Sequence, residues 1–173
     1  MMTDRIQRRG AQAATAQTDT SALTLYTRQG YPREWTQQRL HGIALRQRLA
    51  REWASRGART GDDYASLTDA LTVGAFGMNV ETYKVAKGLR SSQSLRDSMT
   101  TRELLLLNLI EETTLTLSQA RDSQGMEALL RDAWEGSAIG AATRRDIEAR
   151  TGRSIVTPAN YRALRQPRTP DAA

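Results

Sequence analysis

The stretch from Leu104 to Ile110 constrains the fold of this chain more than any other feature of its sequence. Projected onto a helix, the stretch is apolar on every side, and such helices lie in the centre of a fold. Thr100 and Glu103 stand directly before it and form a capping box, in which each side chain accepts a hydrogen bond from a backbone N–H of the other. The sequence therefore predicts a buried central helix that begins after Thr100.

Proline, glycine and capping residues divide the rest of the chain into further helical segments. Signals for β-strands are confined to Ser154–Val156. The predicted helices are a long one from Pro32 to about Arg56, closed by Gly57; one from Gly61 to near Gly74; a short one after the N-cap Asn79, ending at Gly88; the central helix; two at 123–134 and 138–150, the latter closed by Gly152; and a last turn from Pro158 to Leu164.

These segments predict an all-α fold, a compact bundle of about five to six helices over residues 23–165. Leu, Ile, Val and Phe make up only 30 of the 173 residues, so the core is expected to be thin. Residues 1–22 have few large apolar side chains and are predicted to be a flexible arm. Residues 166–173 are predicted to be a flexible tail.

The composition disfavours several classes of function. The chain has no Cys and one His, His41, which argues against thiolate or multi-histidine metal sites and against most histidine-based catalysis. Glu111 and Glu112 are adjacent, so on a helix they diverge by about 100° and do not converge on one substrate atom. We expect no enzyme and no cofactor. Without an apolar leader or membrane span, we also expect a cytoplasmic protein with no membrane partner.

The formal net charge is +6, and arginine supplies nearly all of the positive charge because Lys84 and Lys87 are the only lysines. The charge alternates in blocks: residues 31–60, 83–102 and 136–173 are basic, and residues 61–82 and 103–135 are acidic. Two interpretations remain open. Neighbouring elements pair electrostatically, or the basic elements gather on one face and bind phosphate.

Two arginines of the first predicted helix interrupt its apolar face. Arg39 and Arg46 are one heptad apart and project into the apolar stripe, where a charge is costly unless it is paired. The favoured interpretation is an internal ion pair with an acidic block, Asp62 to Asp69 or Glu111–Glu112. A dimer seam and a bound phosphate are the alternatives.

Two other basic clusters are candidates for phosphate contacts. The first surrounds the short helix and comprises Lys84, Lys87, Arg90 and Arg96; the alternative is a local Arg96–Asp97 pair on a solvated face. Tyr83, beside it, either stacks on a base or packs in the core. The second cluster contains Arg144 and Arg145 near a helix C-terminus, where the helix dipole favours cations without any ligand.

Several blocks of the sequence resemble the C-terminal region of DNA-damage-inducible protein D and of related BRO-type phage antirepressors. The resemblance extends from about residue 31 to 161. It is carried by Gly61-Asp62-Asp63-Tyr64-Ala65, Phe76-Gly77-Met78, Tyr83-Lys84, Lys87-Gly88-Leu89-Arg90, Leu95-Arg96-Asp97, Thr100 with Glu103-Leu104, Glu112-Thr113-Thr114 and Thr151-Gly152-Arg153.

The resemblance implies a non-enzymatic regulator of the DNA damage response or of a prophage or mobile element, and self-association as a homodimer. The BRO-type N-terminal domain of such proteins has no counterpart in this sequence, so the DNA-binding role of that domain is not carried over.

Charge and resemblance together lead to two hypotheses. The first is a DNA-binding accessory protein that holds the backbone of single- or double-stranded DNA without reading its sequence. The alternative is an antirepressor-type regulator that binds a repressor or a recombination protein. For the first, the candidate nucleic-acid-binding residues are Arg39, Arg46, Lys84, Lys87, Arg90, Arg96, Arg144 and Arg145.

Overall fold

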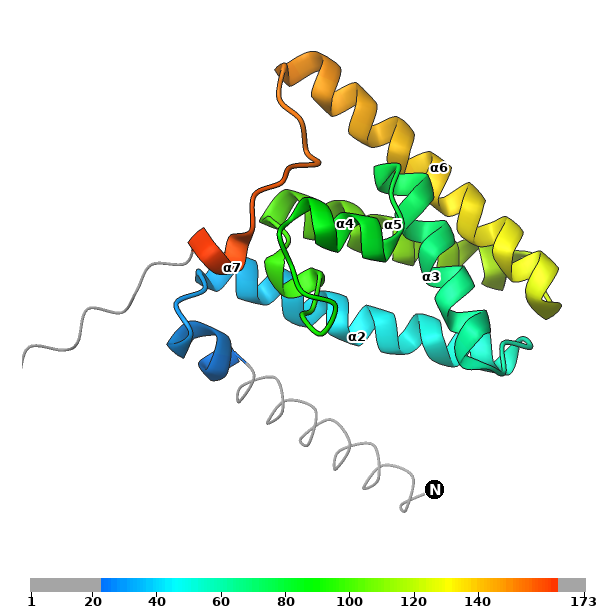
Figure 1. The fold of residues 1–173 in the computed structure, drawn as a ribbon. Coiled ribbons are helices and arrows are strands. Elements are labelled where there is room, and N and C mark those ends of the chain that lie inside the picture. Colours follow the sequence, from blue (N-terminus) through cyan, green and yellow to red (C-terminus); the bar gives the residue numbers. More distant parts are fainter. Residues whose placement is uncertain (1–22, 165–173) are drawn as a thin grey trace, which may run out of the picture.

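A computed structural model describes residues 23–164, and this part of the chain contains helices and no β-strand. The all-α fold class is therefore confirmed (Figure 1). Residues 23–28 are helical, and after them the elements are α2 (Arg33–Ser55), α3 (Gly61–Phe76), α4 (Val80–Ala86), the 3-10 helix η1 (Arg96–Ser98), α5 (Thr101–Ala120), α6 (Gly125–Thr151) and α7 (Tyr161–Leu164). The predicted arm at 1–22 and tail at 166–173 lie outside the described residues.

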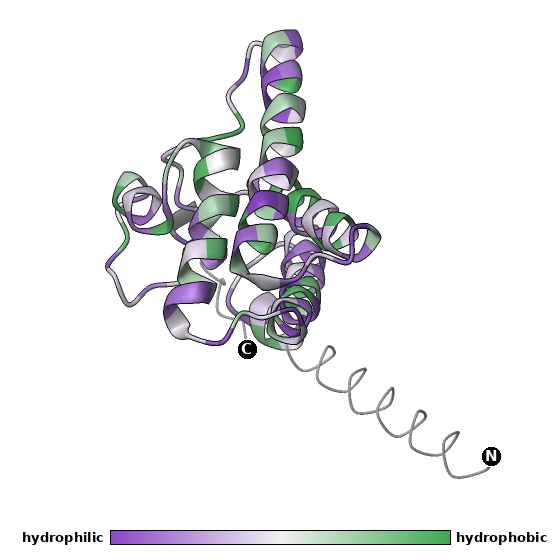
Figure 2. Cartoon of the chain, turned by 90° about the vertical axis from the view of Figure 1, so that its right-hand side faces the viewer, coloured by the Kyte–Doolittle hydropathy of each residue, from purple (hydrophilic) through white to green (hydrophobic). Residues whose placement is uncertain are grey.

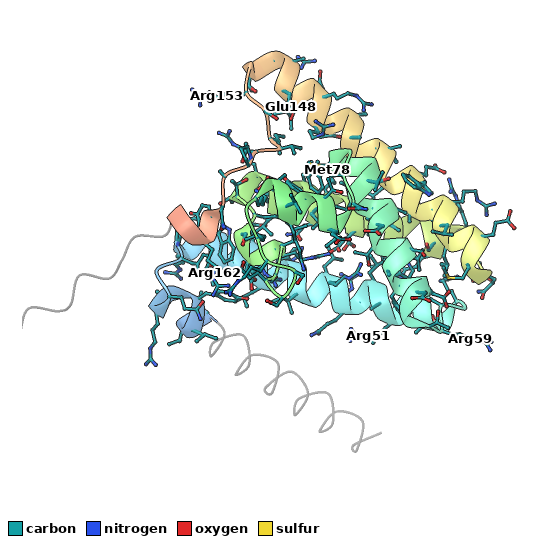
Figure 3. All side chains as sticks on the ribbon, in the orientation of Figure 1. Arg51, Arg59, Met78, Glu148, Arg153 and Arg162 are labelled. Carbon is teal, nitrogen blue, oxygen red and sulfur yellow. The ribbon has the colours of Figure 1, made fainter. Side chains whose placement is uncertain are left out.

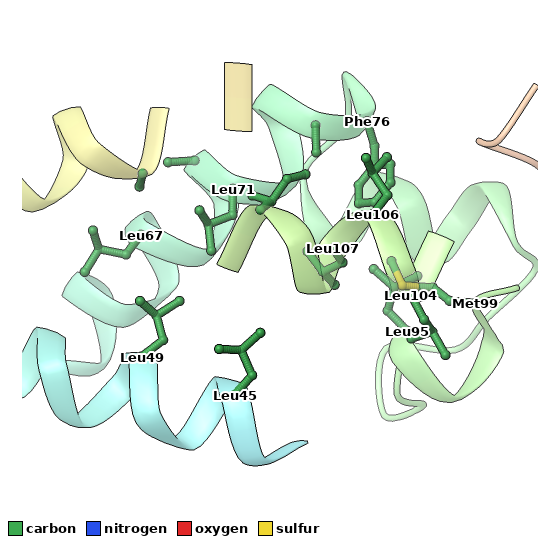
Figure 4. Packing of buried hydrophobic residues seen from close by; sticks show 14 of the residues in the cluster. Leu45, Leu49, Leu67, Leu71, Phe76, Leu95, Met99, Leu104, Leu106 and Leu107 are labelled. Carbon is green, nitrogen blue, oxygen red and sulfur yellow. The ribbon is translucent and has the colours of Figure 1, made fainter. Parts of the chain in front are cut away.

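Helix α5 lies at the centre of the bundle, because it packs against α2, α3 and α6. Figure 4 shows how leucines from α2, α3 and α5 converge with Phe76 and Met99. The prediction of a central helix is confirmed, with one correction. Leu105 and Leu109 are 47% and 44% exposed, so one side of α5 faces solvent.

The predicted capping signals are present in the structure. The Thr100 hydroxyl accepts from the Glu103 N–H and the Glu103 carboxylate accepts from the Thr100 N–H, while Thr60 and Asp63 form a second capping box on α3. Helix α3 continues past Gly74 to Phe76, because Gly74 lies against Ser137 of α6 and serves close packing, not helix termination.

Residues 123–134 and 138–150 were predicted as two helices, and this is wrong: a single unbroken helix, α6, runs from Gly125 to Thr151. Gly136 and Gly140 are both in its interior. A methyl group on Gly136 would overlap the Thr114 hydroxyl, and one on Gly140 would overlap the Ile110 side chain. The glycines thus let α6 approach α5 closely. The last turns of α6 extend beyond the other helices, as two views agree (Figures 1 and 2).

The segment after α6 runs back to the start of α2. The strand signal at residues 154–156 is not realised, since this segment has no ladder partner. The Tyr161 ring stacks on Trp35 at a centroid distance of 5.6 Å, and Trp35 stacks on Tyr31 at 4.1 Å. Trp35 is fully buried and its Nε1–H donates to the Met99 carbonyl oxygen at 2.8 Å. The two ends of the described chain therefore share one aromatic cluster.

The tight α5–α6 contact predicts an unusual response to a glycine-to-alanine change. In an exposed helix interior, Gly→Ala stabilises by up to about 1 kcal/mol. We expect Gly136→Ala to lower the free energy of unfolding by about 1–3 kcal/mol, because the methyl group also meets the Thr114 backbone nitrogen at 3.1 Å. Gly61→Ala, which meets nothing within 4 Å, is the control. Urea denaturation measures both, and equal stability of the two variants would contradict the packing argument.

Candidate anion-binding cleft

Lys87 does not reach solvent, so its prediction as a phosphate contact is wrong. The side chain is fully buried and Nζ lies 2.9 Å from the Glu103 carboxylate, which is also fully buried. Nζ also donates to the carbonyl oxygens of Thr157 at 3.0 Å and Ala159 at 2.7 Å. These acceptors account for its three protons and leave none for a ligand.

Tyr83 belongs to the same buried group. Its hydroxyl donates to Glu103 Oε1, and its ring lies 5.1 Å from Lys87 Nζ. Burial, followed by the negative charge of Glu103, raises the pKa of the hydroxyl far above its usual value, so Tyr83 stays a donor. The packing interpretation of Tyr83 is therefore right, and its ring is not available to stack on a base.

Arg39 forms the internal ion pair that was favoured for it, with a partner outside the two acidic blocks considered. Its Nε lies 2.7 Å from Asp97 Oδ1. The local Arg96–Asp97 pair, considered as the alternative to phosphate contact, does not form, because Asp97 pairs with Arg39 and Arg96 pairs with Glu111. Arg144 is likewise used inside the fold: it pairs with Glu148 at 2.9 Å and donates to the Ala75 carbonyl oxygen at the end of α3. Neither arginine is part of a free phosphate-binding surface.

Arg46 and Arg96 share a single buried carboxylate. Arg96 donates both terminal nitrogens to Glu111, at 2.5 and 3.3 Å, and Arg46 Nη1 lies 3.7 Å from Glu111 Oε1. Glu111 is fully buried, whereas the two arginine side chains are 25% and 20% exposed. The predicted pairing of Arg46 with the Glu111–Glu112 block is confirmed, but two guanidinium groups on one carboxylate leave an excess of positive charge.

The Arg46 guanidinium is incompletely satisfied. Nη2 donates to the Thr68 hydroxyl and the group lies 4.8 Å from the centre of the Trp53 ring, but Nη1 is buried and has no hydrogen-bond partner among residues 23–164. Burial lowers the pKa of Arg46, partly offset by the charge of Glu111. A buried N–H donor without an acceptor costs about 1–3 kcal/mol, so this guanidinium is a weak point in the packing.

Arg46, Lys84 and Arg96 line a pocket of about 220 Å³, and a second pocket of about 500 Å³ adjoins it. We call the smaller pocket the inner chamber and the larger one the outer chamber. The two share walls, since Thr68, Val80 and Lys84 line both. The inner chamber is also lined by Thr72, Ser94, Leu95, Met99 and Leu107. The outer chamber is also lined by Tyr64, Ala65, Asp69, Asn79, Glu81 and Ser91. We call the two chambers together the cationic cleft.

Sequence reasoning placed three cations of this cleft but missed its α3 wall. Tyr64, Thr68 and Thr72 follow one another at intervals of four residues, which puts them in one row on α3. That spacing was a signal for a shared polar surface beside the leucine stripe. Lys84 Nζ donates only to the Ser91 carbonyl oxygen, at 2.6 Å, among the described residues.

The remaining candidates, Arg90 and Arg145, are exposed and form no ion pair within residues 23–164. Arg90 directly precedes Ser91 of the outer chamber, whereas Arg145 lies on the far part of α6. Other exposed arginines are spread over the molecule, as Figure 3 shows for Arg51, Arg59, Arg153 and Arg162. The cationic cleft therefore brings together three of the eight predicted residues, Arg46, Lys84 and Arg96.

Comparison with protein-family models and with curated proteins found no match. Within residues 23–164, no helix has both the length and the hydropathy that crossing a membrane demands. The same residues contain no group of three or more His, Asp or Glu side chains arranged to hold a metal ion.

The burial of Lys87 predicts a large difference between two nearby lysines. Lys87→Met leaves Glu103 as a buried charge without its cation, which costs about 3–5 kcal/mol. Lys84→Met removes one solvent-accessible hydrogen bond and should change stability by less than about 1 kcal/mol. Urea denaturation followed by circular dichroism measures both free energies. A Lys87→Met variant as stable as Lys84→Met would show that the pair does not stabilise the fold.

Proposed function

We propose that this chain is a non-enzymatic nucleic-acid-binding accessory protein of the DNA damage response or of a phage or mobile element. One observation supports the proposal above all. Arg46, Lys84 and Arg96, three of the residues predicted to contact phosphate, line the inner chamber, and among the described residues Glu111 is the one carboxylate that pairs with its two arginines.

The chemistry of the inner chamber suits a phosphate group. Three cations against one carboxylate leave an excess of two positive charges, and guanidinium groups present planar N–H forks that match phosphate oxygens. The acids Asp69 and Glu81 line only the outer chamber, so they repel an anion toward the inner one. Arg90, at the edge of the outer chamber, is placed to contact the adjoining backbone.

The fold leaves this protein fewer free cations than its sequence suggests. Arg39, Lys87 and Arg144 are held by Asp97, Glu103 and Glu148. The proposed interface therefore consists of Arg46, Lys84, Arg90 and Arg96, and Arg145 lies away from it. Contacts of this kind are electrostatic and do not read sequence, so binding should weaken steeply as salt rises.

DNA affinity measured against salt tests the proposal. We expect Lys84→Gln combined with Arg90→Gln to reduce the slope of log affinity against log salt by about 2, since each residue that contacts phosphate contributes about 1. Arg131→Gln combined with Arg145→Gln removes the same charge from exposed positions on α6 and is the control. Fluorescence anisotropy with single- and double-stranded oligonucleotides gives the readout. Absence of binding at about 50 mM salt would end the proposal.

A second candidate function has one specific observation in its favour. Leu105 and Leu109 are exposed and lie one turn apart on α5, forming an apolar pair on its solvent-facing side, between the exposed Arg102 and Glu112. An antirepressor-type regulator needs such a surface for a repressor or recombination protein, and the expected homodimer would compete for it.

Sedimentation equilibrium separates these uses of the apolar pair. If the chain is a homodimer through this surface, Leu105→Lys combined with Leu109→Lys should convert it to a monomer. The dimer interface would then have to bury two charges in place of two leucines. Leu25→Lys, another exposed leucine, is the control. A wild-type protein that is already monomeric would contradict the homodimer and leave the apolar pair free for a different protein.

A further inference from the structure

We propose that the cationic cleft is a site for a nucleoside 5′-phosphate, with the phosphate in the inner chamber and the base in the outer one. The inference rests on the proposed function, because it names the part of a nucleic acid that the cleft receives. A free mononucleotide and the 5′-phosphorylated end of a strand both carry this chemistry.

The size of the cleft matches a ligand of this kind. Small-molecule sites measure roughly 300–1,000 Å³. The inner chamber, at about 220 Å³, is below that range, whereas the two chambers together are within it. The ligand therefore has a compact end that enters the inner chamber and a larger body that fills the outer one.

The charge of the inner chamber favours a terminal phosphate over an internal one. A phosphate monoester carries close to two negative charges at neutral pH, since its second pKa is about 6, whereas a backbone diester carries one. The excess of two positive charges around Arg46, Lys84 and Arg96 matches the monoester. Arg46 contributes its charge to the chamber, since its Nη1 is buried and has no accessible surface for a ligand oxygen.

The end wall of the inner chamber gives the same answer. Met99 and Leu107, which line it, are buried core residues, so a ligand cannot continue through the chamber on their side. We infer that the phosphate is the terminus of its ligand. A strand would enter with its 5′ end first and leave through the outer chamber.

The outer chamber offers an aromatic ring, apolar side chains and hydrogen-bond acceptors. Tyr64, Ala65 and Val80 supply the surface against which a base packs, with Tyr64 available for stacking. Asp69 Oδ1 accepts from the Val80 N–H, and its second oxygen and the Glu81 carboxylate are free for donors on the ligand. Carboxylates accept from amino groups of bases, so guanine should be preferred over thymine, which has no amino group.

Isothermal titration calorimetry with the whole chain at low salt tests the site. The probes are dGMP, dTMP, deoxyguanosine and inorganic phosphate. We expect dGMP to bind at least tenfold more tightly than deoxyguanosine, inorganic phosphate or dTMP. Equal affinity for dGMP and inorganic phosphate would mean that the outer chamber takes no base, and equal affinity for dGMP and deoxyguanosine would mean that the inner chamber takes no phosphate; either result overturns the inference.

Two variants address the chambers separately, each with a matched control. Lys84→Gln removes one cation of the inner chamber and should weaken dGMP about tenfold, while Arg145→Gln, a charge loss on distant α6, should not. Ala65→Trp fills the outer chamber from the exposed side of α3 and should abolish base-dependent binding. Ser66→Trp is its exposed neighbour outside the chamber and should leave binding intact. Equal effects of variant and control in either pair overturn the assignment.

Oligonucleotides with and without a 5′-phosphate distinguish this inference from the proposed function. A 5′-phosphorylated single strand should bind at least tenfold more tightly than the same strand ending in a hydroxyl. Equal binding of the two strands would overturn the terminal-phosphate site and leave the nucleic-acid function standing. Binding of dGMP without binding of any strand would support the site as one for free nucleotides and overturn the nucleic-acid function.

Discussion

The buried ion pair between Lys87 and Glu103 holds together parts of the chain that are distant in sequence. Glu103 accepts from the Thr100 N–H, the Tyr83 hydroxyl, Lys87 and the Thr157 N–H, while Lys87 also donates to the carbonyl oxygens of Thr157 and Ala159. A buried pair is tolerated when hydrogen bonds satisfy what the partner ion does not. The capping residue of α5 therefore also fixes α4 and the segment after α6.

The arginines of this chain serve two different purposes, decided by how many carboxylates the fold brings to them. Arg39 and Arg144 each meet their own acid, so their charge is balanced within the bundle. Arg46 and Arg96 meet one acid between them, and Lys84 on the same wall meets none within the described chain. The alternating charge blocks thus resolve mostly into pairing between elements, and positive charge remains where pairing is incomplete.

The parts of the structure that depend on neighbouring residues could be predicted from the sequence, and the parts that depend on distant ones could not. The capping boxes, the Asn79 N-cap and the Gly152 C-cap are local, and they mark the helix ends correctly. Gly136 fits either a helix end or close packing when the sequence is considered alone, and only the position of Thr114 on α5 decides for packing. Lys87 was expected to be exposed like Lys84, because the segment that buries it, at Thr157, lies 70 residues further along the chain. The cleft could not be predicted from the sequence, because its lining comes from α2, α3, α4, α5 and the segment around η1.

Tyr161 of α7 stacks on Trp35 of α2, and Trp35 on Tyr31, so the last described element rests on residues near the start of the described chain. Fraying at the C-terminal end would uncover the indole that anchors the N-terminal end, and the reverse is also true. The two ends should therefore open as one cooperative unit, with similar amide hydrogen-exchange protection on both, even though they are separated by nearly the whole bundle in sequence.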